Sequence, residues 1–191
     1  MLYYFYMKKI VFSVLVVVLI TLGLWSLRQK DPVVVDNDVP MGDALKDFSV
    51  STYTYTASPT LQIQGTKYII PQSLSEGTNL ASDTYVSRES IPGLATCSAD
   101  RFFDGTHQTV TVTDPENNVT YSVATSSGAG AGNRYEEVVY AVPGTDPCIG
   151  IRFFIHYSVL QNYEPGAVME FNKQALGERL DRARRALYPD T

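Results

Sequence analysis

An uninterrupted apolar run near the N-terminus constrains this chain more than any other feature. Residues 10–27 read IVFSVLVVVLITLGLWSL and contain no charged side chain. At about 1.5 Å of helical rise per residue, the run spans about 27 Å, close to the thickness of a bilayer's hydrocarbon core. Val and Ile are poor helix formers in water, but in lipid an unpaired backbone amide costs several kcal/mol and forces the helix. The run therefore predicts a transmembrane helix.

The surroundings of this run favour an uncleaved anchor over a cleaved signal peptide. Basic residues stand on both sides of it, and it offers no good pair of small residues for a signal peptidase. A cleaved signal is the alternative that the sequence leaves open. We expect a short cytoplasmic N-terminus (1–9), a single membrane span (10–27), a linker rich in proline and acidic residues (28–42) and an extracytoplasmic domain (43–191).

The part of the chain beyond the span is acidic. Residues 31–191 carry eleven Lys and Arg against twenty Asp and Glu. Such a surface does not attract nucleic acid or anionic lipid through bulk electrostatics. We therefore expect the protein to contact the lipid bilayer through 10–27 and to bind no nucleic acid.

The domain sequence predicts an α+β fold. Short stretches rich in Val, Ile, Thr and Tyr alternate with turn residues, which is typical of antiparallel strands. The helical spacing of apolar residues from Phe171 to Leu187 predicts an amphipathic helix across the sheet, with Asn172 as its N-cap. The stretch 149–158 is apolar on both alternating faces and should be a central strand. The other expected strands are 51–56, 61–64, 67–70, 84–89, 108–113, 120–125 and 135–142.

Two stretches carry a resemblance to uncharacterised membrane-anchored envelope proteins of bacteria. They are SLSEGTNLASDTYVS (73–87) and GAGAGNRYEEVVYAVPGTDPCI (128–149). The element order over 120–188 also resembles the α/β/α sandwich of PsbP/Mog1-like domains. The resemblance implies an architecture, an address in the bacterial envelope and an envelope protein as a second partner. It implies no reaction, because such folds host many functions.

The two cysteines of the chain, Cys97 and Cys148, give the strongest local hypothesis. Two lone cysteines in an exported domain usually pair. The predicted disulfide closes a loop of about fifty residues, worth roughly 4 kcal/mol in the chain-entropy model. The alternative is two separate buried thiols.

A glycine-rich run suggests a loop that contacts a partner. The run GAGAG at 128–132 lacks the Lys-Ser/Thr of a phosphate loop and precedes a strand, which favours a mobile hairpin tip over a nucleotide site. The neighbouring Glu136 and Glu137 suit a solvated strand edge or a rim that a basic partner contacts. The candidate binding residues of this loop are Gly128, Gly130, Gly132, Asn133, Arg134 and Glu136.

Two further polar groups could carry chemistry. His156 shares a strand face with Arg152, but no nucleophile-elbow sequence accompanies it, and a histidine hydrogen-bonded within the fold is the simpler interpretation. Asp100, Asp104 and His107 could bind a metal, but their spacing matches no metal motif and turns often collect such residues. We therefore expect neither a metal nor a cofactor.

These features together favour a membrane-anchored binding or interaction module over an enzyme. The alternatives are an envelope hydrolase that uses His156 or His107, and a structural subunit of an envelope assembly. Ten tyrosines follow the linker, and an exposed cluster of them would mark a contact surface.

Overall fold

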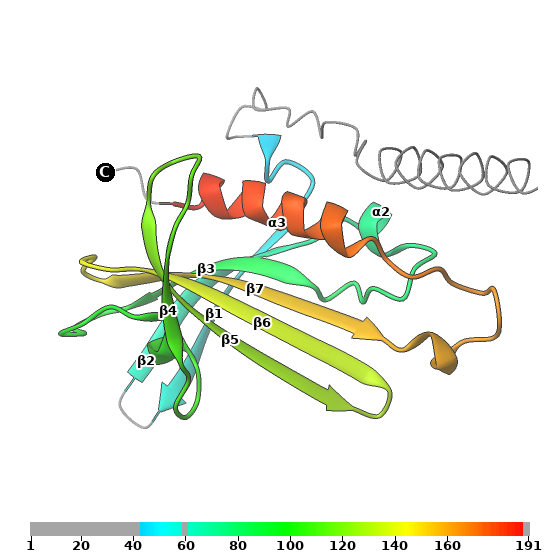
Figure 1. Ribbon diagram of the computed structural model, residues 1–191, viewed down its shortest axis with the longest axis horizontal. Coiled ribbons are helices and arrows are strands. Elements are labelled where there is room, and N and C mark those ends of the chain that lie inside the picture. The colour runs from blue at the N-terminus through cyan, green and yellow to red at the C-terminus, as the bar shows by residue number, and fades with distance from the viewer. Residues whose placement is uncertain (1–42, 59–60, 189–191) are drawn as a thin grey trace, which may run out of the picture. The chain divides into compact units, whose positions relative to one another are not determined.

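The computed structural model of the protein describes residues 43–58 and 61–188 (Figure 1). The predicted cytoplasmic N-terminus (1–9), transmembrane helix (10–27) and linker (28–42) all lie outside these residues. Within the described part of the chain, no helix is both long and apolar enough to cross a bilayer.

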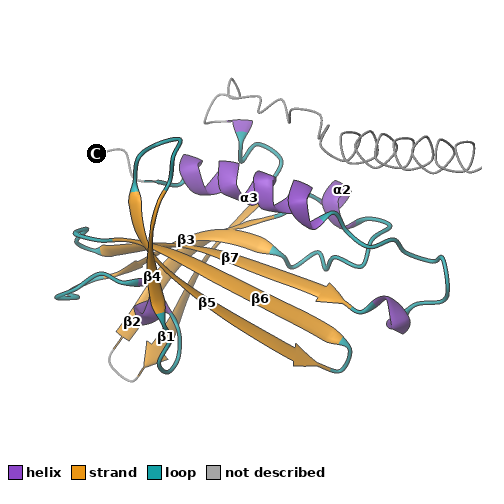
Figure 2. Ribbon diagram, in the orientation of Figure 1, coloured by secondary structure: helices purple, strands orange, loops and turns teal. Residues whose placement is uncertain are grey.

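The described residues form a seven-stranded antiparallel sheet in the order β1-β2-β3-β7-β6-β5-β4. One long helix, α3, lies across one face of this sheet (Figure 2). The predicted α+β class is confirmed. The elements are β1 Ser49–Ser58, β2 Leu61–Ile69, α2 Gln72–Ser75, β3 Tyr85–Ile91, the 3-10 helix η2 Ala99–Phe102, β4 Thr109–Thr113, β5 Thr120–Gly130, β6 Asn133–Val142, β7 Cys148–Ser158, the 3-10 helix η3 Leu160–Asn162 and α3 Lys173–Ala186.

The strands agree with the sequence prediction at the centre of the sheet, and two expected strands are joined into one. The stretches 61–64 and 67–70, predicted as two strands, are one strand, because Gly65 continues the ladder and pairs with Tyr53 on one side and Glu89 on the other. The predicted central strand is β7, which lies between β3 and β6. A strand in that position is covered on both faces, which explains its two-sided apolar pattern.

Helix α3 forms as predicted and closes the main hydrophobic core. The side chain of Asn172 accepts a hydrogen bond from the backbone N–H of Ala175 at 3.0 Å, which satisfies one free donor of the first turn. Leu176 and Leu180 are buried on the inner face of the helix. They pack against a set of sheet residues that includes Val86, Ile151 and Phe153.

A buried ion pair fastens the helix to the turn between β4 and β5. Arg184 donates from Nη2 to Asp114 Oδ2 at 2.5 Å, and both side chains are almost fully buried. The guanidinium also lies between the rings of Tyr121 and Tyr140, at 4.8 and 4.7 Å from their centroids. Burial alone raises the pKa of Asp114, but hydrogen bonds from a backbone N–H and from Arg184 outweigh burial and hold the pKa below its ordinary value.

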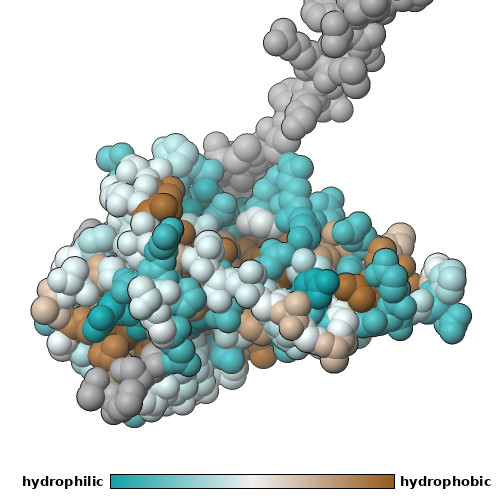
Figure 3. Space-filling view, turned by 60° about the horizontal axis from the view of Figure 1, so that its bottom comes forward, coloured by the Kyte–Doolittle hydropathy of each residue, from teal (hydrophilic) through white to brown (hydrophobic). Residues whose placement is uncertain are grey.

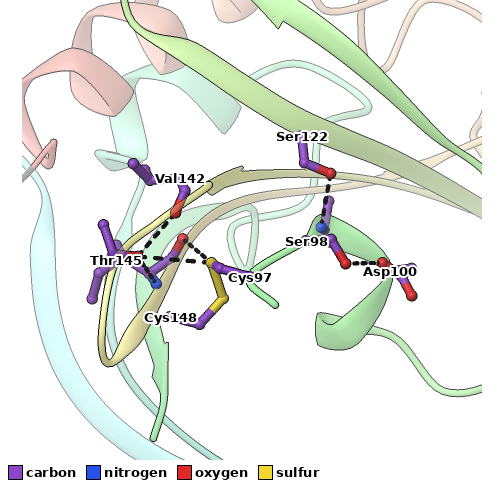
Figure 4. Close-up of a disulfide and its surroundings, with 9 residues drawn as sticks. Cys97, Ser98, Asp100, Ser122, Val142, Thr145 and Cys148 are labelled. Atoms are coloured by element: carbon purple, nitrogen blue, oxygen red, sulfur yellow. Dashed lines mark hydrogen bonds between the residues drawn. A yellow bond between two sulfur atoms is a disulfide. The ribbon is translucent and has the colours of Figure 1, made fainter. Parts of the chain in front are cut away.

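The opposite face of the sheet has its own smaller core, which a disulfide anchors. Cys97 and Cys148 are bonded, as predicted, with their Cα atoms 5.1 Å apart (Figure 4). Beside them, Thr145 Oγ1 donates to the carbonyl of Val142 at 2.9 Å and accepts from the N–H of Ile149 at 3.0 Å. The disulfide therefore ties the segment that enters η2 to the first residue of β7, on the face that α3 leaves open.

Candidate functional site

A pocket of about 470 Å³ lies on the sheet face opposite α3. Val86, Val138 and Phe153 face the helix, so their chain neighbours on the same strands point to the other side of the sheet. Figure 3 turns that side forward and shows apolar patches set among polar residues. The residues that line the pocket come from six strands, from the end of η2 and from the loop after it: Tyr53, Tyr55, Lys67, Tyr85, Phe102, Phe103, Asp104, His107, Ser126, Glu137, Arg152 and Phe154.

Two glycines make room for aromatic rings on this face. Glu89 on β3 pairs with Gly65 on β2 and with Gly150 on β7. A Cβ atom on Gly65 would lie 2.7 Å from the ring of Tyr53, and one on Gly150 would lie 2.6 Å from the ring of Phe102. Only residues without a side chain let both rings lie against the sheet. The glycines therefore shape the site by positioning rings on either side of Glu89.

The floor of the pocket is a buried ion pair between Glu89 and Arg152. Arg152 donates from Nε to Oε1 at 2.7 Å and from Nη2 to Oε2 at 3.1 Å, and the two side chains are 0% and 6% exposed. This is the two-pronged geometry that makes an Arg–carboxylate contact strong. Burial by itself lowers the pKa of Arg152, but the charge and hydrogen bonds of Glu89 outweigh burial and raise the pKa above its ordinary value. Arg152 is therefore a fixed cation.

Two tyrosine hydroxyls also donate hydrogen bonds to the carboxylate of Glu89. Tyr53 donates to Oε1 and Tyr55 to Oε2, the latter at 3.2 Å, and Ser87 Oγ donates to Oε1 at 2.8 Å. Burial raises the pKa values of Tyr53 and Tyr55 far above the ordinary value, and the charge of Glu89 raises them further. Both hydroxyls therefore stay protonated and act as hydrogen-bond donors.

The other side of Arg152 faces the loop after η2 and strand β6. Nη2 donates to the carbonyl of Phe102 at 2.5 Å, and Nη1 donates to Glu137. The guanidinium carbon lies 5.0 Å from the centroid of the Phe103 ring. Glu137, at 28% exposure, is the part of this network that reaches solvent. Arg152 thus joins the sheet to the loop that forms one wall of the pocket.

Lys67 is the cation of the pocket that holds no carboxylate among the described residues. Its ammonium lies 4.6 Å from the ring centroid of Tyr53 and 4.3 Å from that of Tyr85. Tyr85 in turn stacks on Phe154 with centroids 5.0 Å apart. Rings attract an ammonium through their electron-rich faces but leave its charge uncompensated. The ammonium of Lys67 can therefore still attract an anion.

The predicted His156 site is split by the fold. Nδ1 of His156 contacts Asp83 Oδ1 at 2.7 Å, the ring stacks on Tyr135, and Nε2 is buried with no partner in the described part of the chain. Ser158, the nearest serine on the same strand face, donates instead to Asn133 at 2.8 Å. Arg152 belongs to the pocket floor. These residues form no nucleophile–base pair.

The predicted Asp100, Asp104 and His107 group is also divided. Asp100 accepts a hydrogen bond from Ser98, whereas His107 Nε2 lies 3.1 Å from the carbonyl oxygen of Asp104. Asp104 and His107 line the pocket, and Asp100 does not. Over 43–58 and 61–188, no three His, Cys, Asp or Glu side chains are grouped closely enough to hold a metal.

The glycine-rich segment differs from the predicted mobile tip. Strand β5 continues through Gly128 to Gly130, and β6 begins at Asn133, so only Ala131 and Gly132 form the turn. Both turn residues have positive φ, 49° and 80°, which matches the tight hairpin turn that follows the sheet's twist. Only alanines separate the glycines of this run, and both residue types are depleted in strands, so the composition does not indicate the last residues of β5.

The prediction that Glu136 and Glu137 lie on a sheet edge is wrong. Strand β6 is interior, between β5 and β7, and its two glutamates point to opposite faces. Glu136 bonds Lys173 at 3.0 Å and Tyr157 at 2.7 Å on the helix side, whereas Glu137 bonds Arg152. Arg134 is exposed near the hairpin turn. Of the predicted loop residues, Gly128 and Gly130 pair with Tyr135 and Asn133, which alternate along β6 with Arg134 and Glu136. The two glycines therefore lie on the other face of the sheet from these two charged side chains.

Sequence reasoning missed most of the pocket. Tyr53, Tyr55 and Tyr85 were anticipated only as members of an undivided tyrosine group, and Lys67 and Glu89 were not singled out. One signal was available: the alternation YTYT at 53–56, which puts two tyrosines on one strand face.

No protein-family model, curated protein or solved structure matches this chain. The resemblance to PsbP/Mog1-like domains and to bacterial envelope proteins therefore stays a prediction, and the site is interpreted from its own geometry.

Proposed function

We propose that this protein is a binding module that holds a small ring-bearing anion in the pocket opposite α3. The observation that carries the proposal is the position of Lys67, whose ammonium lies against the rings of Tyr53 and Tyr85 and pairs with no carboxylate of the described residues. An acidic group on a ligand would supply the missing counter-charge.

The shape and lining of the pocket support the presence of a ring in the proposed ligand. Ligand pockets commonly enclose about 300–1,000 Å³ and combine aromatic walls with a few polar groups. This pocket, at about 470 Å³, is bounded by ring pairs, among them Tyr85 stacked on Phe154 and Phe103 tilted against His107. Aromatic pairs gain about 0.5–1.5 kcal/mol beyond burial when their centroids lie about 4.5–7 Å apart. A ring inserted here can stack in the same way.

The polar groups of the pocket suit binding better than catalysis. Arg152 and Glu89 are joined by two hydrogen bonds, and the hydroxyls of Tyr53 and Tyr55 donate hydrogen bonds to Glu89. Groups held in this way keep the walls rigid, which lowers the entropic cost of binding. Covalent catalysis requires a nucleophile that an adjacent base activates. The tyrosine hydroxyls lie beside the carboxylate of Glu89, but burial and the charge of Glu89 raise their pKa values, which disfavours the nucleophilic phenolate form.

The proposed cellular location is the membrane of the bacterial envelope. Residues 10–27 serve as a single-pass anchor, and residues 43–191 stand outside the cytoplasm, with an envelope protein as a second partner. The apolar run supports the anchor. The Cys97–Cys148 disulfide supports an oxidising compartment, where such bonds persist.

The test compares benzoate with benzamide, which has the same ring but no charge. The full chain in detergent micelles is examined by saturation-transfer NMR, alongside K67M and the control K46M, which removes an exposed lysine before β1. We expect a benzoate signal that exceeds the benzamide signal, survives K46M and is lost in K67M. An equal benzoate signal from K67M and the unmodified chain would contradict the proposal.

A further inference from the structure

The edge strand β4 is exposed along its whole length. Thr109–Thr113 pairs only with β5 in the described sheet, and all five side chains are exposed, with Val110 at 61% and Val112 at 42%. The strand reads TVTVT and carries no charge and no proline. Natural edge strands are usually protected from pairing by lysine, proline or a bulge. This edge has none of these protections and remains able to accept another strand.

The sequence of β4, TVTVT, reads the same in both directions, so two copies of the strand can pair antiparallel with like residues opposite each other. In an antiparallel pair centred on Thr111, Thr109 of one copy lies opposite Thr113 of the other, and Val110 lies opposite Val112. Residues directly opposite each other share a face of the sheet. The four valines of such a pair would therefore gather on one face and the six threonines on the other.

Both faces continue contacts that the sheet already makes. On the side of α3, Val110 and Val112 pair with Val123 and Tyr121 of β5, which are buried. On the other side, the hydroxyls of Thr113 and Thr120 already lie 3.0 Å apart across the β4–β5 pair. A second β4 would extend the valine patch and the threonine ladder by one strand.

We propose that β4 pairs with β4 of a second copy of this chain, antiparallel and with a two-fold axis at Thr111. The symmetric sequence selects this occupant, because with the axis at Thr111 each valine lies opposite a valine and each threonine opposite a threonine. The absence of charge permits the pairing, since no register position sets like charges against each other. A two-fold contact also needs a surface that complements itself, and this strand provides one.

The size of the contact indicates a dimer that dissociates. Stable interfaces bury about 1,200–2,000 Å² in total, and two paired strands of five residues fall short of that area. The experiment therefore traps the dimer covalently. Both native cysteines are joined in a disulfide, so a cysteine introduced into β4 is the single free thiol.

The position of the axis predicts which cysteines join. Directly opposite residues have Cα atoms about 4.5–5.5 Å apart, within the range of a disulfide. T111C in the full chain, purified in detergent and mildly oxidised, should form a covalent dimer. T109C alone and T113C alone should each stay monomeric, because the two cysteines of such a dimer would lie four residues apart along the paired strands, or about 13 Å. A mixture of T109C and T113C chains should cross-link, because positions 109 and 113 lie opposite each other.

T54C is the matched control on the opposite edge of the sheet. Thr54 is exposed at the middle of TYTYT in β1, an equally symmetric sequence, but the neighbouring Tyr53 and Tyr55 are committed to Glu89. We expect T54C to cross-link at least ten times more slowly than T111C. Equal rates for the two, or equal rates for T109C, T111C and T113C alone, would overturn the proposed contact.

A charge exchange tests the same contact without oxidation. Residue 111 of one copy lies opposite residue 111 of the other, so T111K and T111E each set two like charges against each other. Each variant should therefore abolish the cross-link between reporter cysteines at positions 109 and 113. Mixing T111K with T111E chains should restore it. Cross-linking that persists in T111K alone would overturn the pairing.

Discussion

Arg152 contacts two carboxylates, that of the partly exposed Glu137 and that of the buried Glu89. Replacing Glu89 with Gln keeps the shape of the side chain and removes the negative charge from the buried pair of Glu89 and Arg152. The two side chains are 0% and 6% exposed, so water does not compensate for the loss. Either orientation of the new amide also turns an NH₂ group toward an N–H of Arg152, because Nε and Nη2 donate to different oxygens. Removing one partner of a buried pair costs about 3–5 kcal/mol. At about 2–4 °C per kcal/mol, E89Q should lower Tm by about 6–20 °C.

Urea unfolding of the full chain, followed by circular dichroism, measures the effect. The control is E136Q, since the Glu136–Lys173 pair is 40% and 54% exposed and should contribute less than about 1 kcal/mol. The double variant E89M/R152M removes both buried charges, and we expect it to be more stable than E89Q. Equal losses for E89Q and E136Q would refute the reasoning, because they would mean that Glu137 and solvent balance the charge of Arg152 without Glu89.

Three further predictions follow from the contacts. Replacing Cys97 and Cys148 by serine should lower the free energy of unfolding by about 2–4 kcal/mol, measured by urea unfolding, because the unfolded chain gains entropy. The pKa of Asp114 is lower in the folded protein than its ordinary 3.8, so stability should be lost as pH falls through 3.8 and toward the folded-state pKa, and D114N should flatten this acid limb of the Tm–pH curve. Burial raises the pKa values of Tyr53 and Tyr55, so the stability of the fold should decrease as pH rises above 10. In an alkaline titration, absorbance at 295 nm should show the ionisation of these two tyrosines only when the protein unfolds, and this last increase in absorbance should be smaller in Y53F/Y55F.

The sequence was sufficient for the elements whose local signals agree with their packing. The helix 173–186 has a cap, a helical apolar period and a following proline, and it appears where these signals place it. The alternation of Val, Ile, Thr and Tyr located most strands because one face of each is buried. The disulfide followed from the count of cysteines and the expected compartment.

The pocket could not be predicted because it depends on register across the sheet. Glu89 lies beside Gly65 and Gly150 only after β2, β3 and β7 align, and these residues are far apart in the chain. The strand order is likewise non-local, since β7 inserts between β3 and β6. The charge pair at 136 and 137 was misjudged for the same reason: strand chemistry alone does not distinguish an edge strand from an interior one.

The central claim is that the face opposite α3 binds a ring-bearing anion through Lys67. Anomalous diffraction from crystals of the protein soaked in 4-iodobenzoate tests it most directly. We expect an iodine peak in the pocket between Tyr85 and Phe103, with the carboxylate within about 3 Å of Nζ of Lys67. Iodine bound only elsewhere on the molecule, or in the pocket with its carboxylate turned away from Lys67, would contradict the account.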